Sequence, residues 1–237
     1  MRVESQPAYV LHARAWRETS LLLEVFSRDH GRVGLLARGV RSARARITRA
    51  TLEPFQLLSA DWAGTGELPN LRAAEAVGAP RRFVDDALLS GLYVNELLVR
   101  LIARADPHPA LFARYAVLLE ELATTDSLAW TLRRFERDLL GELGYGLQLE
   151  HEGESGEPLR SDAEYVYVPE LGPVPAHSRQ HGAMSKGSAL LALHEDVKPA
   201  HDDLAALRRV LRAVIASHVG EQGLRAWRVL GGAMRGT

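Results

Sequence analysis

The hydrophobic pattern of the chain changes near Pro80, and this change limits the folds that the chain can adopt. Before Pro80, short apolar runs alternate with turn signals, a pattern typical of strands. After Arg82, apolar residues recur at steps of three and four, which is typical of amphipathic helices. We therefore expect an α+β protein, with a small β-domain over residues 1–80 and a helical domain over residues 81–237.

Five candidate strands precede Pro80, and they lie at residues 8–14, 19–26, 32–38, 55–60 and 68–74. The turn signal Asp29-His30-Gly31 predicts that the second and third strands form a hairpin. Five short strands at this spacing fit a small closed or partly closed barrel such as an OB-fold. Periodicity alone does not separate an OB barrel from an SH3-like barrel.

The helical domain is predicted to open with a helix that carries one buried apolar stripe. The stripe consists of Leu88, Leu89, Leu92, Leu97, Leu98, Leu101 and Ile102. Further helices are expected at residues 110–123, 128–143, 187–194, 202–219 and about 224–230. Candidate N-caps are Thr125-Asp126-Ser127 for the third helix and Asp202 or Asp203 for the penultimate one. A loop-rich insertion, about residues 146–185, holds one expected strand, Glu164–Val168.

Composition excludes several classes of protein. Apolar residues make up 46% of the chain and charged residues 25%, which is ordinary for a globular protein. No apolar run approaches the roughly 18 residues that a membrane span needs. The N-terminus carries no apolar signal core, so we expect a cytoplasmic protein away from membranes. The chain has no cysteine, which excludes disulfides, thiolate nucleophiles and thiolate zinc sites.

The net charge of -1 hides an uneven distribution of charge. Between residues 28 and 49 a single acid, Asp29, faces seven arginines: Arg28, Arg32, Arg38, Arg41, Arg44, Arg46 and Arg49. Segregated charge within a neutral total indicates a face built for an anion. Solvated loop charge is the alternative interpretation.

Signatures of enzymes are missing from the sequence. It contains no phosphate-binding loop, no dinucleotide fingerprint, no HExxH and no GxSxG elbow. His177 and His181 are four residues apart, but the surrounding prolines and Gly182 argue against a helix that would join them as metal ligands. The acidic cluster Glu150, Glu152, Glu154 and Glu157 lies on a Gly-containing stretch, which favours a solvated loop over a magnesium site. We therefore expect no catalytic residue, no metal and no cofactor.

Signals for binding are stronger. The segment 38–46 places arginines between small residues directly after a predicted strand. Guanidinium groups chelate phosphate oxygens and stack on bases, so an arginine-rich loop on an OB-like barrel indicates a groove for single-stranded nucleic acid. Trp16 and Tyr9 are candidates for stacking on bases, although positions in the core are the favoured interpretation for both.

Two further basic groups are ambiguous by pattern. Arg208, Arg209 and Arg212 lie opposite an apolar stripe of one helix, and the wet side of an amphipathic helix is slightly favoured for them over a DNA contact. The pair Arg133-Arg134 on the third helix allows both interpretations.

Several ordered segments of the sequence together resemble the bacterial RecO family. In the β-domain they are Tyr9-Val10-Leu11, Trp16-Arg17-Glu18-Thr19-Ser20, Val25-Phe26, Gly31-Arg32-Val33, Ala37-Arg38-Gly39-Val40-Arg41, Leu52-Glu53-Pro54-Phe55 and Leu71-Arg72-Ala73-Ala74-Glu75. In the helical part they are Gly91-Leu92-Tyr93-Val94-Asn95-Glu96-Leu97, Leu132-Arg133-Arg134-Phe135-Glu136 and Leu143-Gly144-Tyr145. The resemblance covers residues 8–160 well and the C-terminal helices loosely.

The resemblance implies an OB-fold followed by a helical domain, and a recombination mediator in place of an enzyme. It implies binding to single- and double-stranded DNA, strand annealing, and cooperation with RecR in helping RecA to displace single-strand binding protein. The expected DNA contacts are Arg32, Arg38, Arg41, Arg44, Arg46 and Arg49. Arg133, and less strongly Arg134, is expected to pair with the acidic C-terminal tail of single-strand binding protein.

One stretch departs from the pattern of many RecO relatives. They carry a four-cysteine zinc module after the Gly-Tyr segment, whereas residues 150–157 here contain no cysteine. Zinc is therefore not expected, and this loop must be held by ordinary packing. Two rival functions stay open: a nucleic-acid-processing enzyme with an OB-type domain, and a protein-interaction scaffold.

Overall fold

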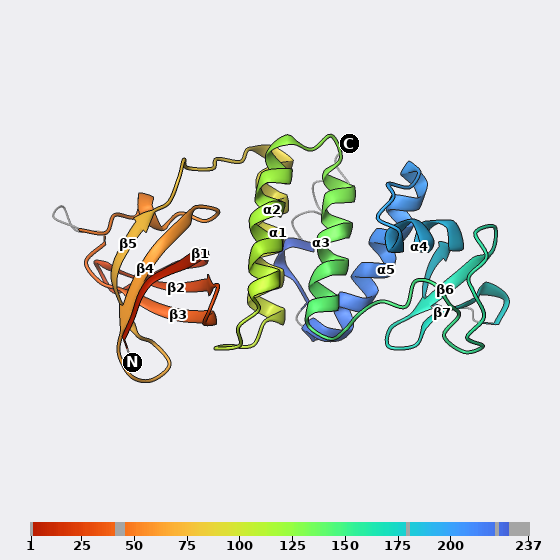
Figure 1. Cartoon of the computed structure of the whole chain (residues 1–237), viewed down its shortest axis with the longest axis horizontal. Coiled ribbons are helices and arrows are strands. Elements are labelled where there is room, and N and C mark those ends of the chain that lie inside the picture. The colour runs from red at the N-terminus through yellow and green to blue at the C-terminus, as the bar shows by residue number, and fades with distance from the viewer. Residues whose placement is uncertain (1, 41–45, 179–180, 221–222, 228–237) are drawn as a thin grey trace. The chain divides into compact units, whose positions relative to one another are not determined.

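The computed structural model describes residues 2–40, 46–178, 181–220 and 223–227, and Figure 1 shows their helices and strands. These residues divide into two compact units. Unit 1 consists of Met1–Ala123 together with the segment that begins at Leu224. Unit 2 consists of Thr124–Gly223. None of the helices in the described part of the chain combines the length and the apolarity that crossing a bilayer requires.

Unit 1 begins with a closed five-stranded barrel. Its strands are β1 (Arg2–Trp16), β2 (Ser20–Ser27), β3 (Gly31–Ala37), β4 (Leu57–Ala63) and β5 (Asn70–Ala76). The strand order β1-β2-β3-β5-β4 is that of an OB-fold, and a parallel bridge between Leu36 and Asn70 joins β3 to β5. Alternate residues of each strand fill one apolar core, which includes Val10, Leu23, Leu35 and Trp62. The α+β class and all five predicted strands are confirmed.

A β-bulge in β1 joins the barrel to the helices of unit 1. The pairing of β1 with β2 shifts between Val10 and His12, so Leu11 has no partner in the ladder. The side-chain amide of Asn95 donates a hydrogen bond of 3.0 Å to the Leu11 carbonyl. The Tyr115 hydroxyl in turn donates to Asn95 Oδ1 at 2.6 Å. This fully buried chain of polar groups satisfies the carbonyl that the bulge releases.

Two helices complete most of unit 1: α1 (Asp85–Leu101) and α2 (Pro109–Thr124). The predicted stop between them, residues 106–109, is confirmed. The predicted buried stripe of α1 is wrong at Leu92, which is 44% exposed, while Tyr93 and Val94 are buried. The cause is that the buried surface of α1 spans a wide arc, from Asn95 at one edge, which bonds the barrel, to Tyr93 and Leu97 at the other, so it is wider than one stripe.

The segment that begins at Leu224 packs into unit 1. Leu224 is 2% exposed, and the Glu96 carboxylate accepts hydrogen bonds from the backbone N–H groups of Arg225 and Ala226, both at 2.8 Å. Residues 225–227 are helical. The predicted helix at 224–230 is therefore present at its start, and residues 228–230 lie outside the described residues.

Unit 2 combines three helices with a small sheet. The helices are α3 (Leu128–Glu142), α4 (Gly187–His194) and α5 (His201–Val219), and the strands are β6 (Glu164–Val168), β7 (Gly172–Pro175) and β8 (Ala183–Lys186). The sheet order is β7-β6-β8. The predicted strand β6 is confirmed at its bounds, whereas β7 and β8 were not expected, because glycines and prolines in this stretch are typical of loops. Asp202 and Asp203 lie in the first turn of α5, and its N-cap is Ala200, so the predicted caps are wrong.

The cysteine-free loop of unit 2 is held by its own hydrogen bonds. The backbone N–H of Glu152 donates to the Glu157 carbonyl at 2.8 Å, and that of Gly156 donates to the Glu152 carbonyl at 3.0 Å. The Ser155 hydroxyl donates to the Glu152 carboxylate at 2.7 Å. Gly153 N donates to the Pro173 carbonyl at 2.8 Å, which fixes the loop to β7. These bonds give the loop a definite shape with ordinary protein groups.

Candidate nucleic-acid interface

The outer surface of strands β1, β2 and β3 is covered at one end and open at the other. At the covered end, Tyr9 and Phe26 lie opposite each other on β1 and β2. Their rings pack against Phe112 of α2, with centroid distances of 5.3 and 5.4 Å. Tyr9 is 1% exposed, so the favoured interpretation of Tyr9 as a core residue agrees with the structure.

The open end carries two arginines and an indole ring. We call this surface the open face, and it consists of Arg14, Trp16, Ser20, Leu22, Leu36 and Arg38. The strand register sets it: Trp16 lies opposite Ser20, Arg14 opposite Leu22, and Leu22 opposite Leu36. Arg38 follows β3 two residues after Leu36, and side chains two apart in an extended chain share a face. Arg14 and Arg38 are exposed, and Trp16 is 42% exposed.

A hollow adjoins the open face. It has a volume of about 240 Å³, and its lining includes His12, Arg14 and Leu22 from the strands and Leu68 from the loop between β4 and β5. In OB-folds the face of strands 2 and 3, with the β1–β2 and β4–β5 loops, binds oligonucleotides and oligosaccharides. The open face and this hollow therefore occupy the place in the barrel where such ligands bind.

Arg14 and Trp16 are the functional candidates that matter most and that sequence reasoning undervalued. Arg14 was not predicted, and Trp16 was assigned more weight as a core residue than as a stacking platform. The signal that identifies them is the alternation of His12, Arg14 and Trp16 along one strand. The described residues provide neither Arg14 nor Arg38 with an ion-pair partner, so both charges stay available to an anion.

Arg32 is placed differently from the other predicted DNA contacts. Its Nη1 donates to Glu24 Oε2 at 2.9 Å, and its Nε donates to the Ile102 carbonyl at 2.9 Å. Arg104 contacts the second oxygen of Glu24. Only 16% of the Arg32 side chain is exposed, so this guanidinium ties β3 to the end of α1.

The remaining predicted arginines follow β3 in the sequence, between residues 41 and 49. Arg46 and Arg49 are exposed, and Arg49 is 3.7 Å from Glu53 Oε1 in an ion pair whose two members are both largely exposed. Arg41 and Arg44 lie outside the described residues. The structure thus brings Arg38 together with Arg14 and Trp16, and it sets Arg32 apart.

The two arginines predicted to bind an acidic tail are both engaged within unit 2. Arg133 forms a buried ion pair with Glu136, one turn further along α3, and its side chain is 6% exposed. Arg134 makes two parallel hydrogen bonds to Asp196, of 2.8 and 2.9 Å. Burial would raise the pKa of Asp196, but hydrogen bonds and charge from Arg134 and Arg137 outweigh it and lower this pKa below its usual value.

The polar side of α5 carries the third basic group. Arg209 and Arg212 are exposed and Arg208 is half-buried, while Leu207 and Val210 are buried on the opposite side. This is the arrangement expected for the wet side of an amphipathic helix.

Comparison with known proteins gives consistent matches along the chain. Residues 1–80 match the family model described as Recombination protein O N terminal, and residues 86–228 match Recombination protein O C terminal. The chain is 46% identical over 234 residues to the DNA repair protein RecO of Xanthomonas oryzae pv. oryzae (strain PXO99A), and the match covers 97% of each protein. It is 47% identical over 233 residues to the DNA repair protein RecO of Stenotrophomonas maltophilia (strain K279a), again over 97% of each. The similarity therefore extends across both units.

Proposed function

Because the chain belongs to the RecO family of DNA repair proteins, we propose that it is a recombination mediator that binds and anneals single-stranded DNA. Together with RecR, it helps RecA to replace single-strand binding protein, and it also binds double-stranded DNA. The domain that holds the DNA is the barrel of residues 1–80. The observation that supports this proposal is the open face, where two available arginines flank an exposed tryptophan.

The open face binds an unpaired strand through stacking and charge. The Trp16 ring stacks on a base, a contact worth about 1–3 kcal/mol and tolerant of sequence. Arg14 and Arg38 contact the flanking phosphates, and the loop arginines Arg46 and Arg49 continue the contact with Arg41 and Arg44. This mode of action makes and breaks no covalent bond. It suits annealing, because a strand that is held by its backbone can still offer its bases for pairing.

Arg32 has a supporting role in this proposal. Its guanidinium already bonds Glu24 and the Ile102 carbonyl, so a phosphate would have to displace a partly buried carboxylate. We therefore propose that Arg32 holds β3 in place and does not itself contact DNA.

The acidic tail of single-strand binding protein is proposed to dock on unit 2 at Arg134. Its bidentate bond to Asp196 has the geometry that a terminal carboxylate also adopts, so the tail would exchange with Asp196. Arg133 lies beneath the surface and pairs with Glu136 of the same helix, so we assign it no direct contact with the tail. An Asp196→Asn variant should bind the tail peptide more tightly than wild type, and Arg134→Ala should bind it more weakly. Equal affinity of all three proteins would reject this site.

The central experiment is strand annealing on oligonucleotides coated with single-strand binding protein. Two variants test the proposal: Arg14→Ala/Trp16→Ala/Arg38→Ala on the open face, and Arg41→Ala/Arg44→Ala/Arg46→Ala in the loop. Both should anneal more slowly than wild type. Arg72→Ala is the matched control, because Arg72 is an exposed arginine on β5 of the same barrel. Equal annealing by wild type and both triple variants would contradict the proposal.

Salt dependence separates a phosphate contact from a loss of folding. If about five phosphates are neutralised, log affinity should fall with log salt at a slope near -3.5 on single strands and -4.5 on duplex. Loss of Arg14 and Arg38 should reduce the slope on single strands by roughly 1.4. A wild-type slope near zero would exclude a phosphate-binding face.

A further inference from the structure

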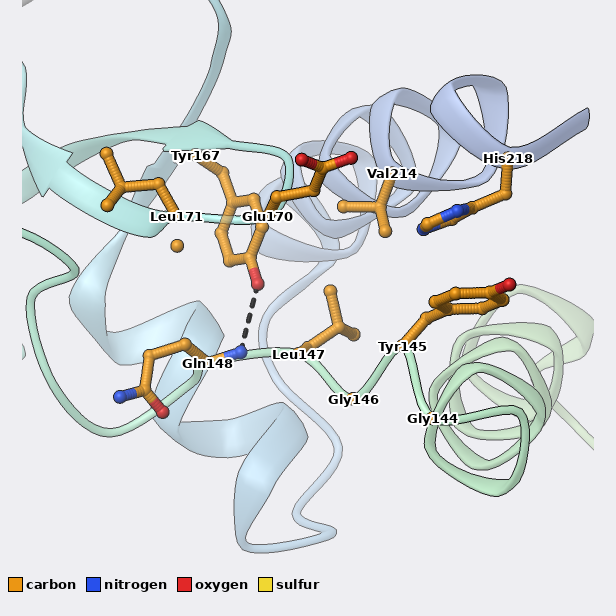
Figure 2. Close-up of a pocket in the computed structure, with 11 residues that line it drawn as sticks. Gly144, Tyr145, Gly146, Leu147, Gln148, Tyr167, Glu170, Leu171, Val214 and His218 are labelled. Atoms are coloured by element: carbon orange, nitrogen blue, oxygen red, sulfur yellow. Dashed lines mark hydrogen bonds between the residues drawn. The ribbon is translucent and has the colours of Figure 1, made fainter. Parts of the chain in front are cut away.

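Unit 2 contains a pocket that is lined by its own residues and takes no part in the proposed DNA contacts (Figure 2). Its volume is about 270 Å³, slightly below the roughly 300–1,000 Å³ of pockets for drug-sized ligands. It is therefore sized for one long side chain. Its walls come from the segment after α3, the turn between β6 and β7, and α5.

Aromatic rings form two sides of the pocket. Tyr145 and His218 stack at a centroid distance of 3.9 Å and an interplanar angle of 21°, with Tyr145 still 45% exposed. The buried Tyr167 hydroxyl accepts a hydrogen bond from Gln148 N at 3.1 Å. Burial raises the pKa of Tyr167 to about 12, so its ring stays neutral at physiological pH. The π faces of such rings attract cations.

The charge on the pocket lining is acidic. Among the described residues that line it, none is lysine or arginine, and Glu170 supplies the one carboxylate. Glu170 has a positive φ of 68° in the turn between β6 and β7, and its side chain extends toward Val214 in Figure 2. Leu147, Leu171 and Val214 add apolar surface that suits an aliphatic stem.

We propose that this pocket binds an arginine side chain presented by a partner protein. The guanidinium stacks on the exposed Tyr145 ring and pairs with the Glu170 carboxylate, while its three methylene groups lie along Leu147 and Val214. A planar guanidinium fits this arrangement better than an ammonium group, because it can stack and form directed hydrogen bonds at the same time. The site is independent of DNA and of the tail site at Arg134, and it extends the proposed function by a further surface for a partner protein.

The test uses N-acetyl-arginine N-methylamide as the probe, titrated into the full chain in the absence of DNA and followed by NMR of the His218 ring. We expect saturable shifts in the millimolar range, and weaker binding of the uncharged citrulline analogue. Glu170→Gln and Tyr145→Leu should each lower the affinity for the arginine probe roughly two- to five-fold. This is the equivalent of about 0.5–1 kcal/mol for an exposed cation–π or ion-pair contact. Circular dichroism shows whether each variant is folded.

The matched control is Glu195→Gln, which removes an exposed carboxylate of unit 2 that does not line the pocket. This variant should bind the probe as wild type does. Three outcomes would overturn the proposal: no saturable shift of the His218 ring, equal binding of the citrulline analogue, or an equal loss in Glu195→Gln and Glu170→Gln. Tighter binding of the corresponding lysine probe would also overturn it, because stacking of a planar group would then contribute nothing.

Discussion

Replacement of Asn95 by alanine should weaken the attachment of α1 to the barrel, and it should destabilise unit 1 by more than the small change in side-chain volume suggests. Asn95 is 2% exposed and serves both as donor to the bulged Leu11 carbonyl and as acceptor for the Tyr115 hydroxyl. Alanine would leave both groups buried without this partner. A buried polar group that loses its hydrogen bond destabilises a protein by about 1–3 kcal/mol. We therefore expect Asn95→Ala to lower the free energy of unfolding of unit 1 by about 2–5 kcal/mol.

Tyr115→Phe provides the internal comparison for this estimate. It removes one hydrogen bond and leaves the bond to Leu11 in place, so the expected loss is about 1–2 kcal/mol. Leu92→Ala, at an exposed position of α1, should change the free energy of unfolding by less than about 0.5 kcal/mol. If the two polar side chains act as one network, the double variant should lose less than the sum of the single losses.

The assay is urea unfolding, combined with hydrogen exchange of peptides from β1 and α1 so that unit 1 is followed on its own. In Asn95→Ala, amides on both sides of the Leu11 bulge should exchange faster than in wild type. A loss smaller than 0.5 kcal/mol, or a larger loss in Tyr115→Phe than in Asn95→Ala, would refute the assigned role of the bulge.

Three further predictions concern other contacts. Gly91→Ala should destabilise the protein by about 1–3 kcal/mol, because a Cβ there would lie 2.8 Å from the Phe55 ring. Gly141→Ala should stabilise it by about 0.5–1 kcal/mol, because a Cβ there would meet no other atom. Thermal unfolding of the two variants measures both effects. Wild type should lose stability below about pH 4, as protonation of Asp196 removes ion pairs that are complete above that pH, and Asp196→Asn should lack this component in acid titrations. Arg32→Ala should destabilise unit 1 by about 1–3 kcal/mol in urea while its salt slope on DNA stays unchanged.

Each of these predictions has an outcome that contradicts it. A stabilised Gly91→Ala would mean that the Phe55 ring moves aside at little energetic expense. Parallel acid profiles of wild type and Asp196→Asn would show that this carboxylate titrates normally. A smaller salt slope in Arg32→Ala would place Arg32 on the phosphates and restore it as a DNA contact.

The sequence predicted the strands and helices well because their signals are local. Short apolar runs bounded by turn signals identify β2 and β3, and three- and four-residue steps identify α3, without knowledge of their neighbours. The open face was harder to predict, because the bulge at Leu11 shifts the alternation of β1 by one residue. Tyr9 precedes that shift, whereas His12, Arg14 and Trp16 follow it. The burial of Tyr9 therefore gave no indication that Trp16 is exposed.

The state of individual arginines depended on contacts distant in sequence. Arg32 is bonded to a carbonyl 70 residues away, and Arg134 to a carboxylate 62 residues away. No local pattern contains such partners, so both side chains looked as available as Arg38. The strands β7 and β8 were missed for a similar reason: pairing with β6 decides their structure, and their own composition is that of a loop.

The hydrogen bond between the Glu96 carboxylate and the backbone N–H of Arg225 has a consequence for synthesis of the protein. Its two members are 129 positions apart, and all of unit 2 lies between them in the chain. A nascent chain on the ribosome can form the barrel early, but it cannot complete unit 1 until residue 226 has left the exit tunnel. Premature termination within unit 2 would therefore release a product whose first unit lacks the buried Leu224 side chain, a target for chaperones and proteases.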